Sequence, residues 1–163
     1  MLKRILSLTV IFSSLFVTSA FAEVAEETAY ILNSFLFLVS GFLVMLMALG
    51  FCLLESGMVT SKSVSAIAAK NIGLYSISGI MFWLVGYNLA YGISEGGYIG
   101  SFTTWTDGSA LADGYSASSD WFFQMVFCAA TASIVSGTLA ERIKIWPFFL
   151  FAAILTGIIY PIE

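Results

Sequence analysis

The stretch WFFQMVFCAATASIVSGTLAER, residues 121–142, decides the fold class of this chain. It carries no charged side chain before Glu141 and Arg142, and it stays apolar around nearly the whole helix surface. Strands are much shorter than this, whereas a helix of this length and composition suits the interior of a bilayer. Small residues follow its aromatic start and let neighbouring membrane helices approach closely. We therefore predict a membrane helix buried within a bundle, with these small residues at its contacts: Ala129, Ala130, Ala132, Ser133, Ser136 and Gly137.

The composition of the whole chain favours the same environment. Hydrophobic residues make up 60% of the 163 residues, charged residues only 10%, and the mean hydropathy is +0.97. Soluble domains carry roughly 25% charged residues, so this chain cannot cover a water-facing surface. Three further long apolar segments also predict helices. The sequence thus predicts an all-α polytopic membrane protein in a lipid bilayer, with four spans at about 30–54, 72–93, 121–139 and 145–162.

Missing residue types exclude several classes of function. The chain has no histidine, which excludes histidine metal sites and nucleophile–histidine pairs within it. Its 6 basic residues form no cluster of the kind that binds nucleic acid. Cys52 and Cys128 both fall in apolar runs, so we interpret them as small buried hydrophobes rather than as a disulfide or metal pair. We predict no enzyme activity, no metal, no cofactor and no nucleic-acid partner.

The first residues are typical of an export signal. Lys3 and Arg4 give a positive start, a short apolar core follows from Ile5, and Ala20-Phe21-Ala22 has the A-x-A pattern of a cleavage site. The alternative is an uncleaved first membrane helix, but the apolar core is short. We predict a cleavable signal peptide at residues 1–22, which places the mature N-terminus outside the cytoplasm.

The charges between the spans predict an orientation. Lys62 and Lys70 flank the turn between the first two spans, and Arg142 and Lys144 lie between the last two. The 93–120 connection is polar and acidic, and it forms either a small structured cap or a flexible segment. The positive-inside rule puts both basic turns in the cytoplasm and this connection outside. We expect a multi-pass protein of the cell's inner membrane.

Two carboxylates near the ends of the spans are candidates for a role. Glu55 stands near the end of the first span, and an acid near membrane depth is a functional candidate by default. The simpler alternative is that it lies at the interface, where it pairs with Lys62 or caps a helix. Glu141 and Arg142 follow the third span, and we expect them to hold helix ends or to anchor the chain at the cytoplasmic face.

Phe123 and Phe127 are the candidate binding residues at the opposite end of the third span. They are four residues apart, so both rings lie on one face of a helix. Such a pair can attract a small cation through its ring faces or form an apolar constriction. It can also simply pack, which is the commonest role of phenylalanine pairs in membrane spans. The spacing alone favours packing.

Four motifs in order resemble those of the Amt/Mep/Rh ammonium transporter family. The F-Q-x-x-F element at residues 123–127 stands at the family's distance from a G-x-L-A-E-R ending at residues 137–142. Residues 54–63 are similar to the family's G-x-V-R-x-K-N turn, although Thr and Ser stand where the family has Arg and Asn. Residues 84–92 resemble its L-x-G-Y-x-L-A-F-G element, and Tyr160-Pro161 resembles the start of its Y-x-P element.

The resemblance covers residues 23–163 and implies a fold and a function. It implies a homotrimer of protomers with roughly eleven helices each, of which this chain supplies the first four. It also implies that Phe127 is the outer gate that recruits ammonium, with Phe123 one turn above it. The family's cation-site tryptophan, its supporting aspartate and both pore histidines come after the end of this sequence.

The function implied is passage of ammonium or ammonia across the membrane. Inverted-repeat transporters need both halves to close a pore, so we expect that this chain does not transport alone. Saturable methylammonium uptake by liposomes holding only this chain would contradict that expectation. The alternative is a membrane ammonium sensor, since some relatives carry signalling domains after the transporter body.

Overall fold

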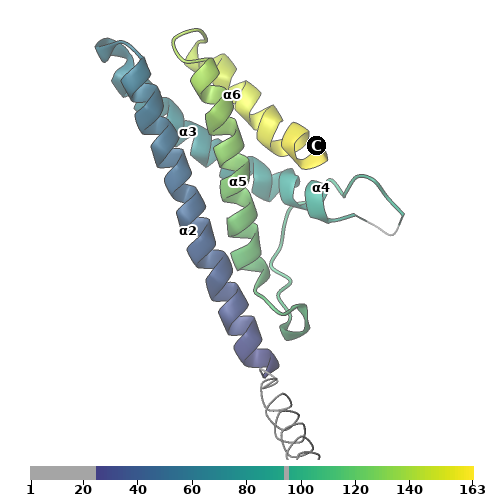
Figure 1. Ribbon diagram of the computed structural model, residues 1–163. Helices are drawn as coiled ribbons and strands as arrows, with labels where there is room; N and C mark the ends of the chain where they lie inside the picture. The colour runs from purple at the N-terminus through teal and green to yellow at the C-terminus, as the bar shows by residue number, and fades with distance from the viewer. Residues whose placement is uncertain (1–24, 94–95) are drawn as a thin grey trace, which may run out of the picture.

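A computed structural model describes residues 25–93 and 96–163 of the chain (Figure 1). Within these residues all regular structure is helical, and four helices are long and apolar enough to cross a membrane. They comprise residues Glu26–Met58, Ser61–Tyr91, Ala117–Thr138 and Ile145–Ile162. The predicted all-α membrane fold is confirmed. The predicted signal peptide, residues 1–22, lies outside the described residues, and how much of each helix lies in lipid stays a prediction.

Helices α2 (Glu26–Met58) and α5 (Ala117–Thr138) run side by side in the same direction (Figure 1). The two helices lie close together at Gly41, where a Cβ would come 2.7 Å from the Phe122 ring and 3.6 Å from the Phe123 Cα. Near the start of both helices, the Asn33 side chain donates a hydrogen bond to the carbonyl oxygen of Gly114. A glycine at the crossing point thus lets an aromatic side chain of α5 pack onto α2.

The second and fourth long helices each contain one π-helical turn. In the second, α3 (Val64–Met81) continues through η2 (Phe82–Gly86) into α4 (Tyr87–Tyr91). In the fourth, α6 (Ile145–Ile154) continues through η4 (Leu155–Ile159) into α7 (Tyr160–Ile162). The two π-helical turns pack against each other. A Cβ on Gly86 would come 3.1 Å from the Thr156 carbonyl oxygen, and one on Gly157 would come 2.7 Å from the Met81 methyl group.

Helix α5 lies at the centre of the described helices, as its small residues predicted. In its most apolar window 44% of the residues are buried, compared with 6% for α2. Two buried clusters surround α5, and both draw on its small and apolar side chains. The Cys128 thiol is fully buried there, within 3.5 Å of the Thr156 carbonyl oxygen. One cluster contains Leu74, Ala132, Phe148, Ala152 and Leu155, and the other Phe82, Met125, Val126, Cys128 and Ala129.

The long connection between α4 and α5 is ordered against the helices over residues 96–116. Its backbone returns along α4, where the Gly100 amide donates to the Leu89 carbonyl oxygen. Further along, the Trp105 indole stacks on that of Trp121, with centroids 5.4 Å apart. A short 3-10 helix, η3 (Leu111–Asp113), precedes α5. Of the two predicted alternatives, the structured cap is the one observed for these residues.

The two ends of the bundle are named here by their connections. The loop end holds the 96–116 connection and the starts of α2 and α5, whereas the turn end holds the short connections at 59–63 and 139–144 (Figure 1). The second helix begins at Ser61, before the apolar segment predicted at about 72–93. Lys70 therefore lies inside α3 rather than beside the turn. Its charge is balanced by a buried acid, which is why the helix tolerates it.

Candidate functional site

Phe123 and Phe127 lie one turn apart on α5, with Phe123 in the loop-end half of the helix and Phe127 near its middle. Their ring centroids are 5.0 Å apart and the ring planes stand at 86°. This edge-to-face contact suits the quadrupoles of two aromatic rings. Phe123 is half-buried, whereas Phe127 is 37% exposed. The structure therefore brings the two predicted residues into contact and leaves part of the Phe127 ring open.

An aromatic row extends this pair across the seam between α2 and α5. The Phe37 ring of α2 lies 5.4 Å from that of Phe123 and 5.1 Å from that of Tyr115, which precedes α5. Phe123 is thus packed on its α2 side, as the packing alternative predicted, while Phe127 stands at the free end of the row. Sequence reasoning missed Phe37, because its span is uniformly apolar and nothing in the spacing singles it out.

Asp120 is buried in the first turn of α5, although the sequence placed it with the acids of the outer loop. Its Oδ2 accepts a hydrogen bond of 2.6 Å from the Tyr87 hydroxyl, and its Oδ1 accepts one of 3.2 Å from the Gln124 amide. An acid also suits the first turn of a helix, where free backbone N–H groups point toward it. Both oxygens have partners, so Asp120 joins α4 to α5.

A second buried carboxylate lies toward the turn end, where Glu55 is only 3% exposed. Its Oε2 accepts hydrogen bonds from the Lys70 ammonium at 3.0 Å and from the Asn71 amide at 3.2 Å. Its Oε1 has no hydrogen-bond partner among the described residues. The expected pairing of Glu55 with Lys62 is therefore wrong, while its position relative to the membrane interface stays a prediction. The residue that neutralises Glu55 is Lys70, which lies in α3, two helical turns after Lys62.

Lys70 is held by α5 and α6 as well as by Glu55. Its ammonium donates to the Ser136 carbonyl oxygen at 3.1 Å, and it lies 5.1 Å from the centroid of the Phe148 ring. A carboxylate, a carbonyl oxygen and an aromatic face together compensate a charge that would otherwise be costly to bury. The Glu55–Lys70 pair consequently connects α2, α3, α5 and α6.

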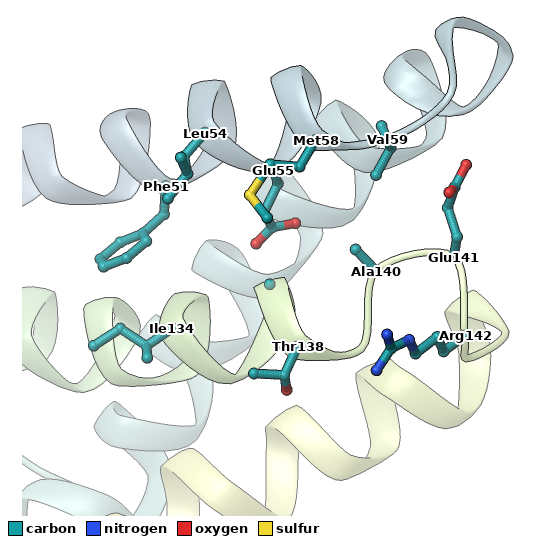
Figure 2. Close-up of a pocket in the computed structure, with 11 residues that line it drawn as sticks. Phe51, Leu54, Glu55, Met58, Val59, Ile134, Thr138, Ala140, Glu141 and Arg142 are labelled. Atoms are coloured by element: carbon teal, nitrogen blue, oxygen red, sulfur yellow. The ribbon is translucent and has the colours of Figure 1, made fainter.

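A cavity of about 610 Å³ lies between the turn-end halves of α2 and α5. Figure 2 shows the Glu55 side chain extending from α2 toward α5, with Glu141 and Arg142 on the connection that follows α5. The wall opposite Glu55 is bare at Gly137, where a Cβ would come 3.9 Å from Oε1. The remaining walls are largely apolar and include Phe51, Leu54, Met58, Val59, Ile134, Thr138 and Ala140.

The two short connections at the turn end are tied together by Glu141. Its Oε1 accepts a hydrogen bond of 2.6 Å from the Thr60 hydroxyl and one of 3.2 Å from the Thr60 amide. The hydrogen bonds from Thr60 hold the pKa of the Glu141 carboxyl below its usual value. Glu141 adopts a left-handed backbone conformation, with φ of 59°. The predicted role of Glu141 in holding helix ends is thus observed, with Thr60 as the partner.

Metal-ligating side chains do not gather in this part of the chain. Over residues 25–93 and 96–163, no three acids or cysteines come close enough to hold an ion.

The chain is a multi-pass α-helical membrane protein whose buried charged side chains are held by contacts between helices. A family model described as Ammonium Transporter Family matches residues 35–163. The ammonium transporter Amt2 of Archaeoglobus fulgidus is 37% identical over 145 residues, covering 86% of this chain and 30% of the relative. A putative ammonium transporter of Synechocystis is 32% identical over 142 residues, covering 84% of this chain and 32% of the relative. This chain belongs to the ammonium transporter family.

A solved structure supports the same assignment at the level of the fold. The protein described as Sensor Amt Protein superimposes with a TM-score of 0.75 at 32% sequence identity, covering 85% of this chain and 34% of that one. The chain therefore spans about a third of the length of the relatives that it matches. Its four helices correspond to part of an ammonium transporter bundle.

Proposed function

We propose that this chain forms part of a transmembrane path for ammonium or ammonia, with Phe127 and Phe123 as its recruitment site. Family membership supports the substrate, because the relatives are described as ammonium transporters. The observation that carries the site is the open ring of Phe127 at the end of an aromatic row. An aromatic face attracts a small cation and sheds water from it.

The orientation follows from the charges at the two ends. Arg142 and Lys144 lie at the turn end together with Lys62, while Asp107 and Asp113 lie at the loop end. The positive-inside rule places the turn end in the cytoplasm and the loop end outside. In that orientation Phe123 lies in the outer half of α5 and Phe127 near its middle, and the acids of the loop attract cations weakly over a Debye length.

The proposal is tested in an assembled transporter, meaning this chain joined to the remaining helices of a family transporter. Phe127→Ala should raise the KM for methylammonium uptake about tenfold, since a desolvated cation–π contact contributes roughly 1–2 kcal/mol. The control is Phe102→Ala, the same change at an exposed ring of the loop connection. If Phe127→Ala leaves uptake unchanged, the ring only packs and the recruitment site is wrong.

Assembly as a homotrimer belongs to the same proposal. Helix α2 exposes most of its length in the isolated chain, and lipid or a second copy can cover such a surface. The molecular mass of the assembled transporter in detergent, measured by light scattering, should equal three protomers. A mass equal to one protomer would contradict the proposed trimer but not the proposed transport path.

A second candidate function is ammonium sensing. One observation favours it, namely that the superimposed structure is described as a Sensor Amt Protein. A sensor binds ammonium at the same aromatic row but passes the signal to a further domain. Ammonium binding without methylammonium uptake by the assembled protein would favour sensing over transport.

A further inference from the structure

Unpartnered polar atoms are concentrated around the Glu55–Lys70 pair. Three buried side-chain atoms there lack a hydrogen-bond partner among the described residues: Glu55 Oε1, Asn71 Oδ1 and Ser136 Oγ. Leaving one such atom unpaired costs roughly 1–3 kcal/mol, and native structures rarely tolerate this without a water or a ligand. The aromatic row plays no part in this cluster, and the recruitment site proposed above leaves it unexplained.

The geometry of the carboxylate shows which atom is free. Lys70 and Asn71 both donate to Oε2, so the charge is neutralised on one oxygen while Oε1 keeps its full capacity to accept. A buried carboxylate oxygen without a donor is unusual, because native structures satisfy nearly all of their buried polar atoms. The free oxygen therefore points to a second partner.

The cavity between α2 and α5 gives that partner a route. Glu55 forms part of its wall (Figure 2). The facing residue Gly137 has no side chain to occupy the space beside Oε1. Because Oε1 itself is buried, a ligand reaches it after a side-chain rotation in the cavity wall. A small ligand needs only a small rotation, whereas a large organic cation needs the wall to open.

The chemistry of the free atoms selects the ligand. Two of the three are acceptors only, as carboxylate and amide oxygens, and the Ser136 hydroxyl can also accept. A ligand with several N–H groups satisfies such a set, while an anion is repelled by Glu55. We propose that Glu55 Oε1 is a binding site for a small N–H donor of the ammonia or ammonium class. This inference rests on the proposed function and adds a contact at the turn end, distant from Phe127.

Direct binding is the first test, and it does not depend on transport. The assembled transporter is labelled with ¹³C at glutamate carboxyls, and the resonance that disappears in Glu55→Gln identifies Glu55. Titration with ammonium chloride should shift this resonance saturably, whereas choline chloride at equal ionic strength should not. The Glu141 resonance, assigned from Glu141→Gln, provides the matched control on the same cavity. An unshifted Glu55 resonance overturns the proposal, because water or an empty site then explains the free oxygen.

Transport supplies the second test. Glu55→Gln combined with Lys70→Met removes both charges and leaves no unpaired buried ion. If Glu55 contacts the permeating species, this double variant should fold and yet lose about tenfold in maximal methylammonium uptake, with an unchanged external KM. Wild-type uptake by a folded double variant overturns the contact with the permeating species. Glu141→Gln, the same change at the rim of the cavity, should keep wild-type uptake.

The two proposals fail in different ways. An assembled protein that shifts the Glu55 resonance but takes up no methylammonium contradicts the transport function and retains the Glu55 site. Conversely, uptake can depend on Phe127 while ammonium leaves the Glu55 resonance unshifted. That result supports the transport function and contradicts the Glu55 site.

Discussion

The two ends of this bundle bury the same chemical group in opposite ways. At the loop end, Asp120 has neutral donors on both oxygens, Tyr87 on one and Gln124 on the other. At the turn end, Glu55 has a cation on one oxygen and nothing on the other among the described residues. The first arrangement is complete and joins two helices. The second is electrically balanced but still has hydrogen-bonding capacity, and it borders a cavity.

Neutralising the charge of a buried carboxylate and supplying donors to both of its oxygens are therefore separate requirements. Lys70 neutralises Glu55 without saturating it, and Tyr87 with Gln124 saturate Asp120 without neutralising it. Glu55 can therefore accept a ligand at its free oxygen. Asp120 cannot do so without breaking a contact between helices. Three measurements test this contrast between the two carboxylates.

Removing Lys70 should have the largest effect on stability. Lys70→Met leaves the Glu55 carboxylate buried without its cation, and breaking a buried pair in this way costs about 3–5 kcal/mol. Unfolding free energies of the assembled transporter, measured by steric trapping in bicelles, should fall by that amount. The double variant Glu55→Gln, Lys70→Met should recover most of the loss. A loss that the double variant does not recover would mean that Lys70 acts mainly through Ser136 and Phe148.

Removing the Tyr87 hydroxyl should have a smaller effect at the other end. Tyr87→Phe leaves one oxygen of Asp120 without a donor, which costs about 2 kcal/mol for a hydrogen bond to a charged group. The same unfolding measurement applies, with Tyr91→Phe as the matched control on the same helix. Equal effects of the two variants would show that the Asp120 contact contributes little.

Protonating Glu141 should have the smallest effect. The hydrogen bonds from Thr60 lower the pKa of this carboxyl, so its titration should have a midpoint below 4.5. Because the folded pKa is the lower one, the tie between the two turns is present above the unfolded value and is lost as the pH falls through the folded value. A carboxyl ¹³C titration measures the midpoint, and Thr60→Val should raise it. A midpoint at or above 4.5 in the parent chain contradicts the contact.

The fold class was predictable because it depends on many residues at once. Length, charge content and hydropathy each favour membrane helices, and ordered motifs indicate the family without any single residue deciding it. The burial of α5 was also predictable, since runs of alanine, serine and glycine at a helix surface serve close contacts. Phe123 and Phe127 are brought together as predicted because four residues make about one turn of any α-helix.

The polar pairs were not predictable, because they depend on how separate helices rotate against each other. Lys70 looked like the end of a span, since a charge in an apolar run usually marks the interface. Its partner lies 15 positions earlier on another helix, and no local pattern connects the two. Asp120 similarly looked like one more acid in an acidic loop. Its burial depends on Tyr87, which the sequence presents only as part of a motif.

The π-helical turn at Phe82–Gly86 sets the rotational phase of everything that follows it on its helix. A π turn holds one residue more than an α turn, and each residue of an α-helix advances the direction of its side chains by about 100°. If the same residues formed α-helical turns instead, every later side chain of this helix would be rotated by about 100°, and the Tyr87 hydroxyl would no longer point toward Asp120. The extra residue in the π turn thus changes the direction in which the later side chains of this helix point. The helix thereby presents Gly86, at the end of the turn, to η4 and the Tyr87 hydroxyl to Asp120 of α5.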